Sequence, residues 1–193
     1  MNVLFISMNN NSAVLNPLAV RVLEELLNGK AHVRELAERA GMPASTAHKT
    51  LKALEKKKIV MSQAVKNRKE YSISQDSALA NSVLRTIIIE KIMRTRSFGK
   101  LKKTRPQGIV LFGSCASGRI TQDSDIDLAI FFKEKKDSFK ISETKRMLES
   151  ELKKEVQLIT LNDEKLESFK KQNTELYNQM RYNSVVLFGE GIE

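Results

Sequence analysis

Apolar residues recur at helical spacing in the first third of the chain and predict three short helices. The first is expected from Pro17 to a stop at Asn28-Gly29, the second at His32–Ala40, and the third after the turn Gly41-Met42-Pro43. Ala47, Leu51 and Leu54 give the third helix one apolar face. The preceding stretch, Met1–Asn16, is rich in asparagine around the apolar Val3–Ile6, and we expect a loose arm or an edge strand there.

The pattern then changes to strands and one long helix. Ile59–Val65 and Glu70–Ser74 read as strands joined by a basic turn. Ser77–Thr95 carries an apolar face too wide to be covered from one side, so we expect this helix to lie between domains or between subunits. Arg94–Arg105 is basic and is the expected linker, and Pro106-Gln107-Gly108 marks the boundary that follows it.

The second half alternates strands and helices. The expected elements are a strand at Ile109–Phe112, a glycine turn with a short helix, a strand at Leu128–Phe132, a helix at Ser142–Leu152, a strand at Glu155–Leu161, a helix from Asp163 toward Arg181, and a short strand at Val185–Phe188. This order predicts an α+β fold, with a mixed sheet covered by helices.

Charge is divided unevenly between the two halves. Residues 1–105 hold 20 Lys and Arg against 8 Asp and Glu, whereas residues 106–193 hold 13 against 15. The excess of cations in the first half predicts a polyanion partner or, as the simpler alternative, a solubilising surface.

The single cysteine and the lack of any apolar run near the roughly 18 residues of a membrane span favour a cytoplasmic protein that does not enter a membrane.

Two aspartates stand where the segment Gly113–Asp127 leads into a strand. Side chains alternate along a strand, so Asp125 and Asp127 are expected on one face, about 7 Å apart and at the open edge of the sheet. Paired carboxylates favour Mg²⁺, which completes its shell with water and substrate phosphates. Gly113 allows a tight turn, and Ser114 opens a helix whose N-terminus favours an anion.

This segment resembles a known signature. Gly113-Ser114, ten intervening residues and Asp125-Ile126-Asp127 are similar to the motif of the DNA polymerase beta nucleotidyltransferase superfamily, above all its small stand-alone prokaryotic members. The resemblance implies Mg²⁺ or Mn²⁺ on the two aspartates, with a nucleoside triphosphate as substrate or ligand. It implies that Gly113, Ser114 and Ser124 bind the phosphates. Many relatives have an arginine at the position of Ser117, and Arg119 would take over the role of that arginine here.

The chain departs from the family at the third carboxylate. The family's Val-Asp-Leu aligns with Val156-Gln157-Leu158, and an amide neither ionises nor accepts a proton from an acceptor hydroxyl. Glu155 lies two residues earlier on the same strand face, about 7 Å away. The third metal ligand therefore remains open between Glu155 and Gln157.

Residues 17–74 resemble the winged helix-turn-helix of prokaryotic transcription regulators. This resemblance places the third helix in the major groove of double-stranded DNA and implies a homodimer. The expected contacts are Ser45, His48, Lys49 and Lys52 on the helix and Arg68 on the wing. Winged helices also serve as protein-interaction modules, and the lysines that close the third helix also suit its C-terminal dipole.

Taken together, the sequence predicts residues 1–75 as a winged helix-turn-helix, 76–105 as a linking or dimerisation helix with a basic linker, and 106–193 as a nucleotidyltransferase-like domain. The intact Gly113-Ser114 and Asp125-Ile126-Asp127 motifs disfavour a purely structural adaptor, so two functions stay open. The chain is either a DNA-bound transferase of nucleoside monophosphate to a hydroxyl, the acceptor by resemblance being a toxin-like partner protein, or a transcription regulator that binds nucleotide without reacting.

Overall fold

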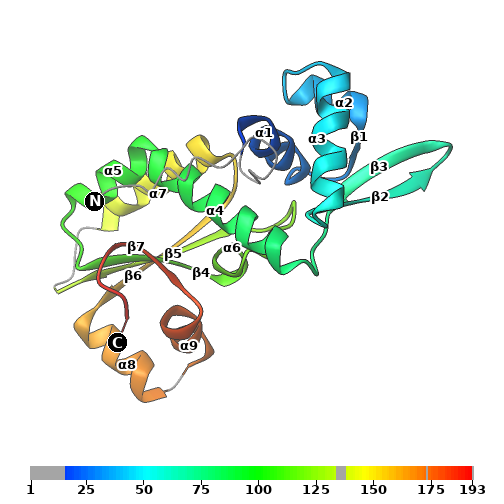
Figure 1. The fold of residues 1–193 in the computed structure, drawn as a ribbon. Coiled ribbons are helices and arrows are strands. Elements are labelled where there is room, and N and C mark those ends of the chain that lie inside the picture. Colours follow the sequence, from blue (N-terminus) through cyan, green and yellow to red (C-terminus); the bar gives the residue numbers. More distant parts are fainter. Residues whose placement is uncertain (1–15, 134–137, 173, 193) are drawn as a thin grey trace. The chain divides into compact units, whose positions relative to one another are not determined.

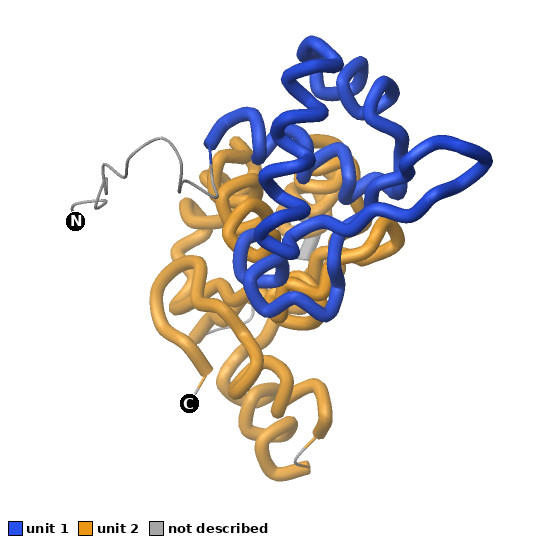
Figure 2. The backbone as a smooth tube through the Cα atoms, turned by 45° about the vertical axis from the view of Figure 1, so that its right-hand side comes forward, with its two compact units in different colours: residues 1–83 blue, residues 84–193 orange. Residues whose placement is uncertain are grey.

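The computed structural model describes residues 16–133, 138–172 and 174–192 of the chain. They form two compact units, residues 1–83 and 84–193, which Figure 2 shows in two colours. The boundary falls inside one long helix, and the expected three-part division at residues 75 and 105 stays a prediction. The predicted arm before Pro17 lies outside the described residues, apart from Asn16.

The described part of unit 1 contains three complete helices, a small antiparallel sheet and the start of a further helix (Figure 1). Its elements are α1 (Pro17–Leu26), β1 (Ala31–His32), α2 (Val33–Arg39), α3 (Ala44–Lys56), β2 (Val60–Val65) and β3 (Arg68–Ile73), with the strand order β1-β3-β2. The Asn16 side chain caps α1 by accepting a hydrogen bond from the Ala19 amide at 2.7 Å. Leu23, Leu36 and Leu51, one from each helix, are fully buried, so the three helices share one core.

The wing differs from the prediction in one detail. β3 already begins at Arg68, so the turn consists of Lys66 and Asn67 alone. Both residues have positive φ, 45° and 62°, which is the backbone of a two-residue hairpin. Arg68 therefore belongs to a strand and lies directly opposite Val65. The two-residue strand β1 was not predicted, because two residues carry no periodic signal.

The expected linker is a helix. α4 (Ala78–Arg94) occupies the predicted long helix, and α5 (Arg96–Lys103) follows it after Thr95, whose hydroxyl accepts from the Phe98 amide at 3.0 Å. Phe98 and Leu101, three positions apart, are buried on one face of α5. The Ser97 amide donates to Glu151 of the later helix α7 (Ser138–Leu152) at 3.2 Å. This basic stretch is therefore helical, because two well-spaced apolar residues suffice to dock a short basic helix, and its part as a linker stays a prediction.

Unit 2 is built on a four-stranded mixed sheet, which confirms the predicted α+β class. Its further elements are β4 (Gly108–Phe112), α6 (Gly113–Ser117), β5 (Ile126–Phe132), α7 (Ser138–Leu152), β6 (Val156–Asn162), α8 (Asp163–Gln172), α9 (Glu175–Tyr182) and β7 (Val185–Gly189). The strand order is β6-β5-β4-β7, and only β5 and β6 are parallel, joined by α7. Helices α5 and α7 lie on one side of the sheet and α8 and α9 on the other (Figure 1).

Two expectations for unit 2 need correction. The single helix from Asp163 toward Arg181 is two helices, because the Thr174 hydroxyl accepts from the Tyr177 amide at 3.1 Å and starts α9 anew. The aspartate pair does not lie at an open edge of the sheet, since β5 is an inner strand between β4 and β6. Finally, no helix in the described part of the chain is both long and apolar enough to cross a membrane.

Candidate active site and nucleic-acid interface

The aspartate pair lies at the start of β5. Ile126 and Leu128 are completely buried, whereas Asp125 and Asp127 are only partly buried, as the predicted alternation requires. Asp127 pairs in register with Phe112 at the end of β4 and with Gln157 near the start of β6. Three neighbouring strands therefore bring their ends together around the two carboxylates.

The electrostatics of the pair favour a cation. Burial raises the pKa of the Asp127 carboxyl, and the nearby charge of Asp125 raises that pKa further. A positive charge placed between the two carboxylates would be attracted to both of them. Within the described residues, no group of three or more His, Cys, Asp or Glu side chains could hold a metal ion, so any cation here would rest on two carboxylates and neutral oxygens.

The glycine turn is built directly against this pair. Gly113 has a φ of 71°, and a Cβ at this position would lie 2.2 Å from Oδ2 of Asp127. Both the left-handed backbone and the closeness of the carboxylate therefore require glycine. Ser114 follows in the first turn of α6, so the serine and the carboxylates stand on adjoining elements of one end of the sheet.

Gln157 lies beside the pair, where the sequence placed it. Its Nε2 donates a hydrogen bond to Oδ2 of Asp125 at 3.3 Å. Glu155 precedes β6, and its backbone carbonyl accepts from the Ile126 amide at 3.0 Å. The Glu155 side chain is exposed at an open depression that it shares with Lys145, Glu149, Lys153 and Lys154. Of the two candidates for a third ligand, Gln157 is thus the one in contact with the aspartate pair.

The loop before the pair contains the two remaining phosphate candidates. Arg119 is exposed at its beginning. The Ser124 hydroxyl accepts from the Thr121 amide at 2.9 Å, so it stabilises the loop itself. Lys154 also reaches this loop, a contact that sequence reasoning missed because a lysine between a helix and a strand carries no distinctive signal.

Cys115 is hydrogen-bonded to the backbone of the aspartate pair. Its Sγ donates to the backbone oxygen of Asp125 at 3.2 Å. Burial raises the pKa of this thiol to about 11, so it stays protonated and remains a donor at neutral pH. The cysteine therefore acts as a packing and positioning group, not as a nucleophile.

The second candidate site is the exposed face of α3. Ala47, Leu51 and Leu54 are buried, whereas the predicted contacts Ser45, His48, Lys49 and Lys52 are exposed, and so is Arg68 on the wing. Lys52 pairs with Glu55 at 3.0 Å, and Glu55 also accepts from Ser62 of β2 at 2.5 Å. The hydrogen bond with Glu55 raises the pKa of Lys52, so this lysine stays charged but shares its charge with an acid.

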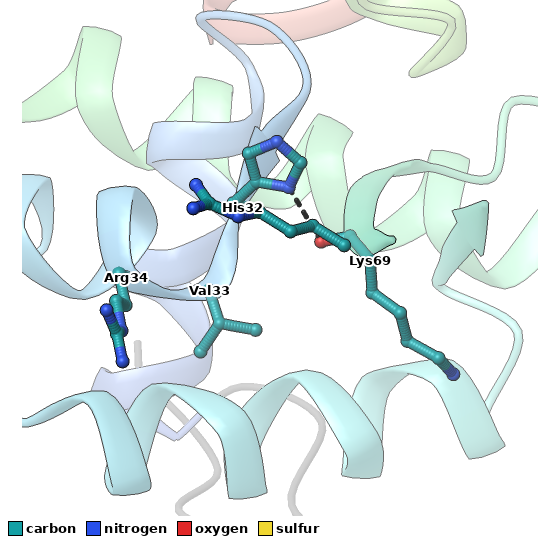
Figure 3. A pocket seen from close by; sticks show the side chains of 5 residues that line it. His32, Val33, Arg34 and Lys69 are labelled. Atoms are coloured by element: carbon teal, nitrogen blue, oxygen red, sulfur yellow. Dashed lines mark hydrogen bonds between the residues drawn. The ribbon is translucent and has the colours of Figure 1, made fainter. Parts of the chain in front are cut away.

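A hollow beside the wing joins His32 and Arg34, which the sequence analysis missed, to the predicted wing residue Arg68. It is lined by His32, Val33, Arg34, Arg68 and Lys69, and Figure 3 shows Arg34 and Lys69 on either side of Val33. Nδ1 of His32 lies 2.9 Å from the backbone oxygen of Lys69, which joins β1 to the wing strand. The periodic pattern did not reveal His32 and Arg34, because the start of α2 and β3 meet only in the folded unit.

Comparison with known families agrees with both resemblances. Residues 99–189 match the family model "Polymerase beta, Nucleotidyltransferase", and residues 15–67 match that of the MarR family. A search of the curated protein sequences found no match.

Several solved structures are similar to parts of the chain. One is the homodimeric winged helix-turn-helix DNA-binding domain of a possible ArsR-family regulator from Mycobacterium bovis, 24% identical over 43% of this chain and 78% of that one, with a TM-score of 0.36. A second is a toxin–antitoxin with AMP-PNP, 28% identical over 49% and 72%, with a TM-score of 0.38. A third is the complex of a tri-AMPylated Shewanella oneidensis HEPN toxin with MNT antitoxin, 23% identical over 57% and 73%, with a TM-score of 0.35.

Proposed function

We propose that this chain, which joins a MarR-type winged helix-turn-helix to a nucleotidyltransferase domain of the polymerase beta type, binds a nucleoside triphosphate with Mg²⁺ or Mn²⁺ and transfers a nucleoside monophosphate to an acceptor hydroxyl. The observation that carries the proposal is the aspartate pair at the start of β5, set against Gly113, where a Cβ would collide with the Asp127 carboxylate. Hard oxygen ligands on a rigid strand suit these cations.

Each residue of the site has a definite part in the proposal. Asp125 and Asp127 hold the divalent cation, which supplies charge stabilisation at the attacking and leaving oxygens when bound. The backbone at Gly113 and Ser114 faces the β- and γ-phosphates, and Arg119, which is exposed, is free to swing toward them. Ser124 serves by keeping the loop folded, because its hydroxyl is already engaged with Thr121.

Gln157 supports a second candidate function, that of a nucleotide-binding regulator without transferase activity. The amide donates to Asp125, whereas a general base must accept a proton from the acceptor. Glu155 would have to leave the depression around Lys153 and Lys154 to take this part. Transfer therefore depends on an acceptor that loses its proton without a base on β6.

The DNA partner of the proposal is assigned to unit 1. Its support is the exposed polar and basic face of α3, continued by Arg68, Lys69 and Arg34 around the wing. A homodimer is part of this proposal, because two-fold symmetry doubles the DNA contact of a helix-turn-helix and matches palindromic sites. A toxin-like partner protein is the proposed acceptor.

The test is calorimetry on the full chain with nucleoside triphosphates, with and without Mg²⁺. The variant Asp125→Ala/Asp127→Ala is expected to lose the part of the binding that depends on Mg²⁺. Asp123→Ala is the matched control, because Asp123 is an exposed acid of the same loop outside the pair. Equal binding by the double variant and the wild type refutes the site. Transfer of labelled nucleotide to a co-purified partner then separates the transferase from the silent regulator.

A further inference from the structure

Lys154 is bound to the loop that precedes the aspartate pair. Its Nζ donates to the backbone oxygens of Thr121 at 3.4 Å, Gln122 at 3.0 Å and Ser124 at 3.1 Å. An ammonium group has three donors and no acceptor, so these three carbonyls use its whole capacity. Lys154 is partly buried and stands between α7 and β6, about thirty positions further along the chain.

The three carbonyls belong to one tight turn. Within it the Ser124 amide donates to the Thr121 oxygen at 3.3 Å, and the Thr121 amide donates to the Ser124 hydroxyl at 2.9 Å. Carbonyl oxygens that face one point repel one another through their partial charges. A cation at that point removes the repulsion and makes charge-assisted hydrogen bonds. A neutral side chain could not satisfy all three oxygens, so the turn depends on the ammonium.

Asp125 follows this turn directly. Its own backbone oxygen accepts from Cys115, and the next amide, Ile126, donates to Glu155, the residue after Lys154. The short segment 154–155 therefore holds the chain on both sides of Asp125, through a side chain before it and a backbone oxygen after it. These contacts fix the backbone from which the Asp125 carboxylate projects.

We propose that Lys154 is a positioning residue, which keeps the turn 121–124 folded so that Asp125 meets the divalent cation together with Asp127. This inference rests on the proposed cation site. Lys154 does not contact the nucleotide in it, because its three N–H groups are directed at the protein. The residue acts in the way of the outer-shell partners that orient metal ligands elsewhere.

The experiment compares Lys154→Met, Lys154→Arg and the control Lys153→Met in the full chain. Met keeps most of the length of the side chain and removes every donor. Lys153 is the exposed neighbour, carries the same charge and lines the same depression, so its replacement reproduces the change of net charge alone. Thermal unfolding is recorded for each variant, so that a loosened turn is distinguished from a loss of the fold.

The first readout is hydrogen exchange of the segment 119–127 without cation or nucleotide. Lys154→Met is expected to raise exchange in this segment and leave β4 and α7 unchanged, Lys154→Arg to restore part of the protection, and Lys153→Met to resemble the wild type. The second readout is the affinity for Mn²⁺ in the presence of nucleoside triphosphate, expected to fall about 10- to 100-fold in Lys154→Met.

Unchanged exchange in segment 119–127 of Lys154→Met overturns the inference, and so does a loosened segment with unchanged Mn²⁺ affinity. Failure of the proposed function looks different. In that case the wild type itself shows no cation-dependent nucleotide binding, and the exchange measurement alone decides whether Lys154 holds the turn.

Discussion

Replacing Gly113 by alanine tests the construction of the site most directly. The backbone of this residue is left-handed, with a φ of 71°, which costs a residue with a Cβ about 1–2 kcal/mol. The new Cβ would also lie 2.2 Å from Oδ2 of Asp127, where ordinary contacts begin near 3.4 Å, so the carboxylate must move by about 1 Å. Overpacking of this kind typically costs about 1–3 kcal/mol.

The two contributions together predict that Gly113→Ala lowers the free energy of unfolding of unit 2 by roughly 2–5 kcal/mol. Urea unfolding followed by circular dichroism measures this loss. Calorimetry with Mg²⁺ and nucleoside triphosphate should show weaker binding, because the displaced carboxylate is a proposed ligand. Gly99→Ala is the control. Gly99 lies inside α5 with nothing within 4 Å of its Cβ position, so alanine there is expected to be neutral or to stabilise the helix by about 1 kcal/mol.

A double-variant cycle separates backbone strain from the clash. In an Asp127→Ala background the carboxylate is gone, so Gly113→Ala should cost only the backbone share, about 1–2 kcal/mol. The difference between the two backgrounds is then the energy of the contact. An equal cost in both backgrounds refutes the argument that the carboxylate requires the glycine. The absence of any cost refutes the argument from φ as well.

Three further predictions concern charge. Folding raises the pKa of Asp127, so the ionised carboxylate destabilises the folded chain at pH values above the folded-state pKa. Below the unfolded-state pKa of about 4, the carboxyl is protonated in both states and this cost is absent. Asp127→Asn should therefore stabilise the cation-free chain against urea at pH 7 and lose that gain near pH 3; an equal gain at both pH values contradicts the assignment. Gln157→Asp should tighten Mn²⁺ binding and raise nucleotide transfer, by up to the ~10²–10⁴-fold that a general base contributes. Glu155→Gln should change neither quantity. The reverse pattern would identify Glu155 as the ligand. The triple variant Lys49→Ala, Lys52→Ala and Arg68→Ala should weaken binding of the full chain to duplex DNA and reduce the slope of log K against log salt by about 0.9 per lost phosphate contact; unchanged affinity and slope in a gel-shift titration would reject this face of α3.

The sequence was informative where a single local rule decided the outcome. Helix starts at Pro17 and Asp163 follow from capping and turn chemistry, and the buried strands around Gly113–Asp127 follow from their apolar runs. It did not predict the helix Arg96–Lys103, because many charged residues surround Phe98 and Leu101, the two apolar residues that share one helix face. A count of apolar residues cannot replace their spacing in so short a helix.

The contacts that complete the site could not be predicted in the same way. The tight turn explains glycine at position 113 from the sequence alone. The short distance between its Cβ position and the Asp127 carboxylate arises only when β4 and β5 pair in register. The role of Lys154 depends on three backbone oxygens, and every residue has such an oxygen, so the sequence does not distinguish the three that Lys154 contacts. Long-range register and side-chain to backbone contacts are thus the information that the fold adds.

The register of β5 and β6 also determines how Gln157 would affect a cation at the aspartate pair. Gln157 lies opposite Asp127 and donates to Asp125, so it faces the carboxylates with the positive end of its amide. An approaching cation would oppose this orientation, but rotation of the amide about its last bond presents the oxygen instead of the nitrogen. Two carboxylates and a neutral amide oxygen carry a charge of minus two, which balances one divalent cation. A third carboxylate would add the negative charge that a second cation needs. With the proposed cation bound, these residues would balance the charge of a single divalent cation, and a second one would need the charge of the triphosphate.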